Sequence, residues 1–199
     1  MVPPAAPADP MLAFPFFGGR PCLDFVATLG RRHATPVERL PDPAALARWI
    51  EQARLGGPAD EARVTTGDLA AARTLREATH RLLTAAMAGR APDPADADQV
   101  NQAARRPDLV PQLALRDGRP ELHTPSGQPV RAVLSTVARD AVLLVGGPLL
   151  DRVKECGNPD CSLLFLDDSQ ARRRRWCSMD RCGNLAKVAG YRSRSRTTS

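Results

Sequence analysis

The chain has 199 residues, of which 43% are hydrophobic, so it can bury one medium core and one small one and is not a wholly disordered chain. No apolar run is long enough to span a bilayer, and the N-terminus does not resemble a signal peptide. The net charge of +6 is uneven, because residues 151–199 carry eleven Lys/Arg against six Asp/Glu. We therefore expect a cytoplasmic protein whose basic C-terminal quarter indicates either a polyanionic partner or a solvated charged tail.

The first segments are a tail and an apolar entry into the core. Residues 1–13 are rich in Pro and Ala, and we expect them to be disordered. The stretch "FPFFGGRPCLDFVATLG" begins at Phe14 and should pack into the core as a short strand and a following turn of helix, entered through Gly18-Gly19. Cys22 lies inside this stretch, where a cysteine is most often a small buried side chain.

The stretch "LPDPAALARWIEQARL" carries a helix start. Asp42 can cap the first turn, and Pro43 suits a position inside it. Leu46, Trp49 and Ile50 then fall on one face. Gly56-Gly57 is expected to end this helix.

Two further helices follow. In "TTGDLAAARTLREATHRLLTAAMAG" the apolar residues recur at steps of three and four from Leu69 to Ala86, and Gly89 closes the pattern. The stretch "PDPADADQVNQAAR" predicts a capped helix from about Pro94 to Ala104.

The period then changes from helical to alternating. Leu113 and Leu115 alternate with polar neighbours, "DGR" supplies a turn and "ELHT" returns, which predicts a β-hairpin. A long apolar helix is expected from Val130 to Val145, ending at Gly146-Gly147. Residues 14–150 are therefore predicted to form a predominantly helical domain with a small β element.

Residues 14–150 show no catalytic constellation, so we expect no enzyme. Their histidines are scattered, and "GGRP" is a turn rather than a phosphate-binding loop. A ligand site beside Arg20 and Asp24, behind Gly18-Gly19, is one hypothesis for a small-molecule effector. The alternative is a structural salt bridge near the first strand of the domain.

Four of the five cysteines form two matched pairs near the C-terminus. Each pair has four residues between its members, and fifteen residues separate the pairs. Thiolates in this arrangement suit one tetrahedral zinc ion, and the Gly, Asn and Pro of "CGNPDC" favour the tight loop that such a site needs. The predicted ligands are Cys156, Cys161, Cys177 and Cys182. Four thiolates fill the coordination shell, which favours a structural ion over a catalytic one.

Two other readings of the cysteines remain. A pair of disulfides is disfavoured in a chain without an export signal, and an iron–sulfur cluster is the second alternative.

The segment around the cysteines predicts a small treble-clef-like zinc finger over residues 151–199. "LLFLD" is a short apolar run followed by a turn at Asp167-Asp168-Ser169, so we expect a hairpin between the cysteine pairs. After Cys182 a helix should begin, with Leu185, Val188 and Ala189 facing inward. So few residues bury little core, and the metal must supply folding energy.

Basic residues gather on this finger. The second arm of the expected hairpin would carry four consecutive arginines, and further bases follow on the helix and beyond it. Arginine forks bind phosphate bidentately and read guanine in the major groove, and a minority of these arginines should instead cap helices or pair with Asp167 and Asp168. The candidate nucleic-acid-binding residues are Arg172, Arg173, Arg174, Arg175, Arg181, Lys187, Arg192 and Arg194.

The finger resembles the CGNR zinc finger family. The shared features are the two C-x4-C pairs, the F-x-D-x-S stretch from Phe165 to Ser169, "RRWCSM" from Arg174, and "CGN" from Cys182. One departure is that Leu185 stands where the family has an arginine. If that arginine contacts DNA or braces the fold, this chain lacks the contact.

The preceding region looks like the ABATE domain, the usual partner of this finger. "GGRPCLDFVATL", "DPAALARWI" and "LREATHRLLTA" carry the likeness, although Ala27-Thr28 replaces the family's frequent Asn-Thr. Together the two resemblances imply a bacterial transcription regulator with an N-terminal sensing or assembly domain and a C-terminal DNA-binding zinc finger.

Three functions are compatible with these features. The first is a zinc-dependent transcription regulator that binds double-stranded DNA, with strong salt dependence. The second is an RNA-binding module, for which only Trp176 and Tyr191 offer stacking surface near the bases. The third is a protein-interaction finger that docks an acidic part of the transcription machinery.

Overall fold

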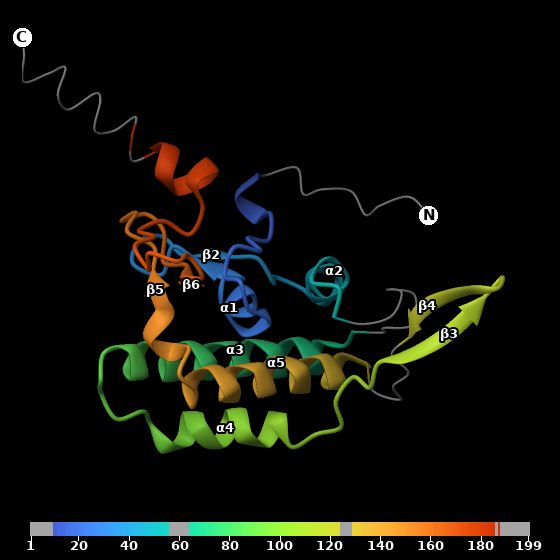
Figure 1. Cartoon of the computed structure of the whole chain (residues 1–199). Helices are drawn as coiled ribbons and strands as arrows, with labels where there is room; N and C mark the ends of the chain where they lie inside the picture. Colours follow the sequence, from blue (N-terminus) through green and yellow to red (C-terminus); the bar gives the residue numbers. More distant parts are fainter. Residues whose placement is uncertain (1–9, 56–63, 124–128, 186, 188–199) are drawn as a thin grey trace, which may run out of the picture.

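The structure is a computed structural model that describes residues 10–55, 64–123, 129–185 and 187 (Figure 1). Pro10–Leu12 form a single 3-10 turn, η1, within the stretch for which we expected disorder; residues 1–9 lie outside the described residues. Among the described residues, no helix combines the length and the apolar content that crossing a bilayer requires.

Three helices form one side of the molecule (Figure 1). α3 (Thr66–Met87) and α5 (Pro129–Val145) lie side by side, and α4 (Pro94–Ala104) packs against both. On the other side of this pair, the short helix α1 (Pro21–Val26) packs on α3 and α5, and α2 (Pro43–Gln52) packs on α3. We call this assembly of residues 14–150 the helical body.

The helix starts follow their caps. The side chain of Asp42 accepts a hydrogen bond from the Ala45 N–H at 2.7 Å, which confirms the predicted start of α2. At α3, Thr65 and Asp68 form a reciprocal capping box. The helix ends at the predicted position, where Gly89 has a φ of +63°. The predicted end of α2 at Gly56-Gly57 lies outside the described residues.

The apolar faces of these helices meet in one core. It is built around Trp49, which is fully buried and tilted against the Phe25 ring at a centroid distance of 5.0 Å. The stripe predicted on α3 is buried from Leu69 to Leu83. Through this core α1 packs on α3 and α5, and α2 packs on α3.

A buried charge network ties the segment after α1 to α3. Arg76 on α3 is 3% exposed and donates to both carboxylate oxygens of Glu38 and to Glu77, at 2.7–2.8 Å. Burial alone would raise the pKa of Glu77, but hydrogen bonds from Arg32 and Arg76 outweigh it and lower this pKa to about 2. The network therefore holds Glu38 and Glu77 ionised inside the helical body.

The segment from Phe14 to Gly30 is arranged differently from the prediction. Among the described residues no strand precedes α1; strand β1 (Leu29–Gly30) follows it and pairs with β2 (Val37–Glu38). The predicted order of strand and helix was therefore wrong. Cys22 is fully buried, as expected.

The predicted β-hairpin forms from β3 (Gln112–Arg116) and β4 (Arg119–His123). Its two-residue turn is Asp117-Gly118, with φ values of 51° and 74°, which is the left-handed pair that a tight hairpin turn requires. The hairpin projects away from the helices, at the right of Figure 1.

The C-terminal finger (residues 151–187) begins with strands β5 (Val153–Glu155) and β6 (Leu164–Leu166), which pair antiparallel with each other. The hairpin that we expected between the cysteine pairs is therefore wrong: β6 returns to β5 across the first pair. The four arginines follow in a segment without strand structure. The loop of the first cysteine pair connects the paired strands, rather than the turn predicted at Asp167-Asp168-Ser169.

Candidate metal centre and basic surface

The two cysteine pairs meet at the tip of the finger. Cys156 directly follows β5, and Cys161 ends the loop that starts there. Cys177 lies just before a π-helical turn, η4 (Met179–Gly183), and Cys182 lies within this turn. The four Sγ atoms lie within 4.8 Å of one another, from segments that are fifteen residues apart in the chain.

The sulfur positions fit a tetrahedral zinc ion. The Sγ of Cys177 lies 4.0 Å from that of Cys161 and 3.7 Å from that of Cys182. A zinc ion with Zn–S bonds of about 2.3 Å needs sulfur–sulfur edges of about 3.8 Å. A disulfide would need about 2.05 Å, and all the cysteines are free thiols, so the disulfide alternative does not describe this site.

The loop between the first two cysteines is shaped by Asn158 and Gly157. The Asn158 carbonyl accepts from the Cys161 N–H at 2.8 Å, and its side-chain oxygen accepts from the Asp160 N–H. The Gly157 N–H donates to the Arg175 carbonyl at 2.8 Å. A Cβ at Gly157 would approach that carbonyl to 3.1 Å and the Trp176 ring to 3.2 Å, so glycine lets the two halves of the site close together.

Negative charge settles most easily on Cys156. The neighbouring Cys161 and Cys177 thiols lower the pKa of Cys156 below its usual range, and the Cys177 N–H, which donates to the Cys156 sulfur at 3.5 Å, adds to this effect. Thiolates are the form in which cysteine binds a metal.

Asp167 organises the segment between the cysteine pairs. It is fully buried, and its carboxylate accepts hydrogen bonds from the ammonium of Lys154 at 2.6 Å and from the Ser169 side chain and backbone. These bonds hold the pKa of Asp167 well below its usual range. The same carboxylate accepts from the Arg174 N–H at 3.0 Å. The Lys154 ammonium also donates to the Arg172 carbonyl at 2.6 Å, so the pair fixes the backbone of the arginine run.

Arg174 points into the finger. Its guanidinium donates to the Cys177 carbonyl and to Asp168, both at 2.9 Å, and lies 4.9 Å from the centroid of the Phe165 ring. Arg174 is therefore a residue that holds the fold, in keeping with the expectation that a minority of the arginines pair with Asp167 and Asp168.

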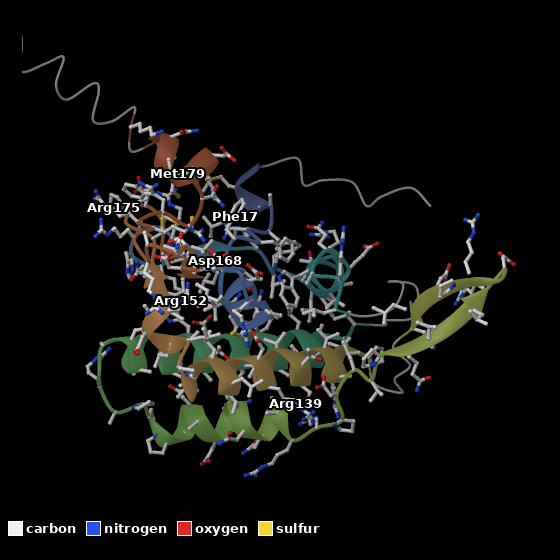
Figure 2. All side chains as sticks on the ribbon, in the orientation of Figure 1. Phe17, Arg139, Arg152, Asp168, Arg175 and Met179 are labelled. Carbon is white, nitrogen blue, oxygen red and sulfur yellow. The ribbon has the colours of Figure 1, made fainter. Side chains whose placement is uncertain are left out.

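The neighbours of Arg174 point outward. Arg172, Arg173 and Arg175 are exposed, and Figure 2 shows Arg175 at the outer side of the finger. The Arg175 guanidinium lies 5.2 Å from the centroid of the Trp176 ring. Within the described part of the chain, the guanidinium groups of Arg172 and Arg173 make no hydrogen bond or ion pair. The anchored backbone therefore presents three positive side chains to solvent.

Arg181 lies at a different place, in a cavity of about 200 Å³ between the finger and the helical body. Arg39 of the body lines the same cavity, together with Cys161 and Cys182. Arg39 is 3% exposed and donates to the Ala13 and Ala27 carbonyls, at 3.0 and 3.2 Å. Burial and the charge of Arg181 lower the pKa of Arg39 to about 10. Two positive charges thus lie beside the thiol cluster.

The role of Arg39 could not be predicted from its place in the sequence. It lies 117 positions before Cys156, and its neighbours in "VERLP" are an acidic residue and a leucine, which is no signal for a metal site. From the sequence we would expect an ordinary surface arginine, whereas in the fold Arg39 lines the cavity beside the thiol cluster.

The helix expected after Cys182 is described only at its start. Residues 184, 185 and 187 are helical, and Lys187 is exposed. Leu185 is 60% exposed, so the prediction that it faces inward was wrong: η4 turns the chain so that this side chain points to the rim of the cavity beside Arg181. Val188, Ala189, Arg192 and Arg194 lie outside the described residues.

The predicted effector residues lie on a second, smaller cavity. Arg20 and Asp24 line a space of about 190 Å³ together with Trp49. Arg20 forms an ion pair with Asp140 of α5, and Asp24 accepts from the Gly18 N–H at 2.8 Å. Arg20 and Asp24 are thus each held by a different partner. Burial, with the added charge of Asp140, raises the pKa of Asp24 to about 6.

The finger is joined to the helical body along its length. The Leu166 N–H donates to the Gly18 carbonyl at 2.8 Å, and Ser162 accepts from the Arg32 N–H at 2.8 Å. Ala27 of the body is packed into the small core that contains the cysteines, while Leu164 of the finger belongs to the core of the body. Each region therefore contributes a side chain to the core of the other.

Two family models match the chain. Residues 19–148 match ABATE, described as "Putative stress-induced transcription regulator", and residues 152–195 match the CGNR zinc finger. A search of curated proteins found no match. With the clustered thiols described above, the second match identifies one structural zinc ion as the metal of this site.

Proposed function

The chain belongs to the ABATE family and ends in a CGNR zinc finger, and from this premise we propose that it is a zinc-dependent transcription regulator whose finger binds double-stranded DNA. One observation carries the proposal. Beside the metal site, the buried Asp167 and the half-buried Lys154 pair with each other and fix the backbone of a segment whose Arg172, Arg173 and Arg175 side chains are exposed.

Such an arrangement suits the phosphates of a duplex. Arginine is always charged and presents a planar fork that binds phosphate bidentately. Because the backbone is fixed, less conformational freedom is lost when the side chains bind. Arg181 and Lys187 of the finger, and Arg192 and Arg194 beyond the described residues, would add further contacts. Each phosphate contact should add about 0.9 to the slope of log K against log salt concentration.

A salt series on duplex DNA tests the proposal. The zinc-loaded chain would be titrated onto its own upstream region and onto random DNA of the same length, with fluorescence anisotropy as the readout. We expect tighter binding to the upstream region and a steep salt slope. Equal binding to both would reduce the activity to general nucleic-acid binding, and no binding to either would leave a protein-docking surface.

A matched pair of variants locates the contact. Arg172→Ala with Arg173→Ala removes two exposed charges of the finger, whereas Arg90→Ala with Arg105→Ala removes two exposed charges of the helical body. We expect the first pair to lower the salt slope by about 1.8 and the second to leave it unchanged. Equal effects of both pairs would mean that only the total charge matters.

Duplex DNA is favoured over single-stranded RNA because of the state of Trp176. Its ring is half-buried and has the Arg175 guanidinium 5.2 Å from its centroid, so little of it is open to stack on a base. Competition with structured RNA separates the two readings: RNA that displaces the upstream DNA at equal concentration would favour the RNA-binding function.

We assign the effector site of the same regulator to the cavity at Arg20, Asp24 and Trp49. Both the Trp49 Nε1–H and the Arg20 Nε–H are buried, and neither has a hydrogen-bond partner among the described residues. Two buried donors on an aromatic wall suit a small aromatic molecule with a carbonyl oxygen.

Acetophenone is a simple probe for this cavity. The chain has two tryptophans, so its indole N–H groups give two separate NMR signals. We expect acetophenone to shift the Trp49 signal and not that of Trp176. No change at Trp49, or equal changes at both, would exclude this cavity as the site. The regulator would act in the cytoplasm, a reducing compartment that keeps the four thiols available to zinc.

A further inference from the structure

The projecting hairpin has one wholly apolar face. In the register of β3 and β4, Leu113 is opposite Leu122, and Leu115 is opposite Pro120. Opposed residues lie on the same face of an antiparallel pair, and so do residues two apart along a strand. These four side chains therefore form one surface, which we call the leucine face.

The leucine face is exposed to an unusual degree. Leu113 is 77% exposed, Leu115 72% and Leu122 74%. Isolated exposed leucines are common on protein surfaces, but three on one face of a single hairpin form a contiguous patch. A two-stranded hairpin is marginally stable by itself, so such a face needs a covering surface.

The other face carries the charges of the hairpin. Ala114 and His123 on it are half-buried, and Glu121 is paired with Arg116 at 3.5 Å. The leucine face itself carries no charged group, so it offers nothing to attract or orient an acidic or basic partner. Its partner must be apolar and of matching shape.

From these observations we propose that the leucine face is a dimerisation surface, covered by the same face of a second copy of this chain. A face that is apolar throughout and carries no charge to repel its own copy can pack against itself about a twofold axis. Two such faces would bury on the order of 1,000 Å² in total, which is the lower limit for a specific interface and fits a reversible dimer. The projection of the hairpin beyond the helices leaves room for this approach (Figure 1).

Sedimentation of the full, zinc-loaded chain over a range of concentrations tests the proposal. We expect a monomer–dimer equilibrium with a midpoint in the micromolar range for the wild type. The variant Leu113→Thr/Leu115→Thr/Leu122→Thr should remain monomeric at all concentrations, and threonine keeps the strand propensity of the hairpin. A wild type that is monomeric throughout, or a triple variant that dimerises like it, would overturn the proposal.

Two exposed apolar residues of α5 supply the control for hydrophobicity alone. Val142 is 41% exposed and Leu143 69%, and both lie outside the hairpin. The variant Val142→Thr/Leu143→Thr should dimerise like the wild type. Loss of the dimer in this variant, with the triple variant unaffected, would move the interface to α5.

Cross-linking tells the two faces of the hairpin apart. Leu115→Cys places a thiol on the leucine face and Ala114→Cys places one on the other face, while the native thiols are buried or clustered at the zinc site. A short bismaleimide should cross-link the Leu115→Cys chain far more than the Ala114→Cys chain. Equal yields would mean that the hairpins do not meet through the leucine face.

Discussion

The helical body and the finger are stabilised by different means. The core of the body is apolar and large, with fully buried Trp49 and Phe25 among its side chains. The separate core of the finger contains Leu163 and Phe165 with three of the clustered cysteines, and it takes Ala27 from the body. The body can therefore rely on apolar burial, whereas the finger depends on its metal and on contacts with the body.

Loss of zinc should give the largest difference in stability between the finger and the helical body. Cys177→Ser removes one of four thiolates, and structural zinc contributes on the order of 10 kcal/mol to the folding of a small finger. We expect the finger to unfold and residues 14–150 to stay helical.

Circular dichroism measures the helices of the body, and Trp176 fluorescence in a Trp49→Phe background reports on the finger. Chelation of zinc from the wild type should give the same pair of results. A body that melts together with the finger would show that the two regions form one cooperative unit.

Two neighbouring leucines of the finger test the core of the finger and the core of the body separately. Leu163 packs with the cysteines, whereas Leu164 is 1% exposed and packs in the core of the body. Leu164→Ala should lower the free energy of unfolding of the body by about 2–4 kcal/mol because it leaves a cavity there. Leu163→Ala should instead speed zinc release and change the melting of the body little. Urea unfolding and zinc transfer to a chelator measure these effects.

If Leu163→Ala and Leu164→Ala changed the stability of the body and the rate of zinc release equally, the two leucines would not belong to separate cores. The physical basis of the prediction is the extended chain at the start of β6: Leu163 directly precedes the strand, and adjacent side chains of an extended chain point to opposite sides.

Arg39 tests whether the body assists the metal site through charge. Four thiolates around one zinc ion carry a net charge of −2, and the buried Arg39 lies in the cavity with Cys161 and Cys182. Arg39→Met keeps much of the side-chain volume and removes the charge. We expect zinc affinity to fall about tenfold, as for the loss of other groups that support metal ligands.

Arg73→Met is the matched control, because Arg73 also donates to a backbone carbonyl of this region, that of Leu40, and does not line the cavity. Zinc transfer to a chelator should be unchanged in this variant. Equal losses in both variants would assign the effect to packing rather than to charge.

His80 provides the smallest effect, confined to the body. Burial and the charge of Arg32 lower its pKa from 6.5 to about 4, so the folded state keeps His80 neutral where the unfolded state binds a proton. The stability from this group is complete above pH 6.5 and falls as the pH drops toward 4.

Between pH 7 and pH 4.5, the wild type should lose roughly 1–2 kcal/mol more than His80→Gln, since solvent screens part of the shift. Urea unfolding followed by circular dichroism at both pH values gives the difference. Zinc release at low pH is common to both chains and cancels in the comparison. Identical pH dependence would show that His80 titrates normally in the folded chain.

Local signals in the sequence were sufficient for much of the fold. The cap at Asp42, the turn at Asp117-Gly118 and the repeated cysteine spacing each act within a few residues, and the structure confirms the helix start, the hairpin and the thiol cluster. Propensity and turn chemistry are local properties, so they can be read without the fold.

Most of the errors concern which segments and side chains meet in the fold. Strand β6 pairs with β5 rather than with the arginine segment, and the carbonyl of Gly18 bonds to Leu166 rather than to a strand of the body. Arg39 and Arg174 look like other arginines until the fold places one beside the thiols and the other against Asp168. Such choices depend on tertiary packing, which overrides local preference.

The most direct test of the account follows DNA binding as zinc is added to the metal-free chain. We predict that affinity for duplex DNA appears together with the folded Trp176 signal and saturates at one zinc per chain, because the ion fixes the segment that presents Arg172, Arg173 and Arg175. The contrary result would be an affinity that is already complete without zinc. In that case the basic residues would bind as an unstructured tail, and the metal-held surface would not be the DNA-binding site.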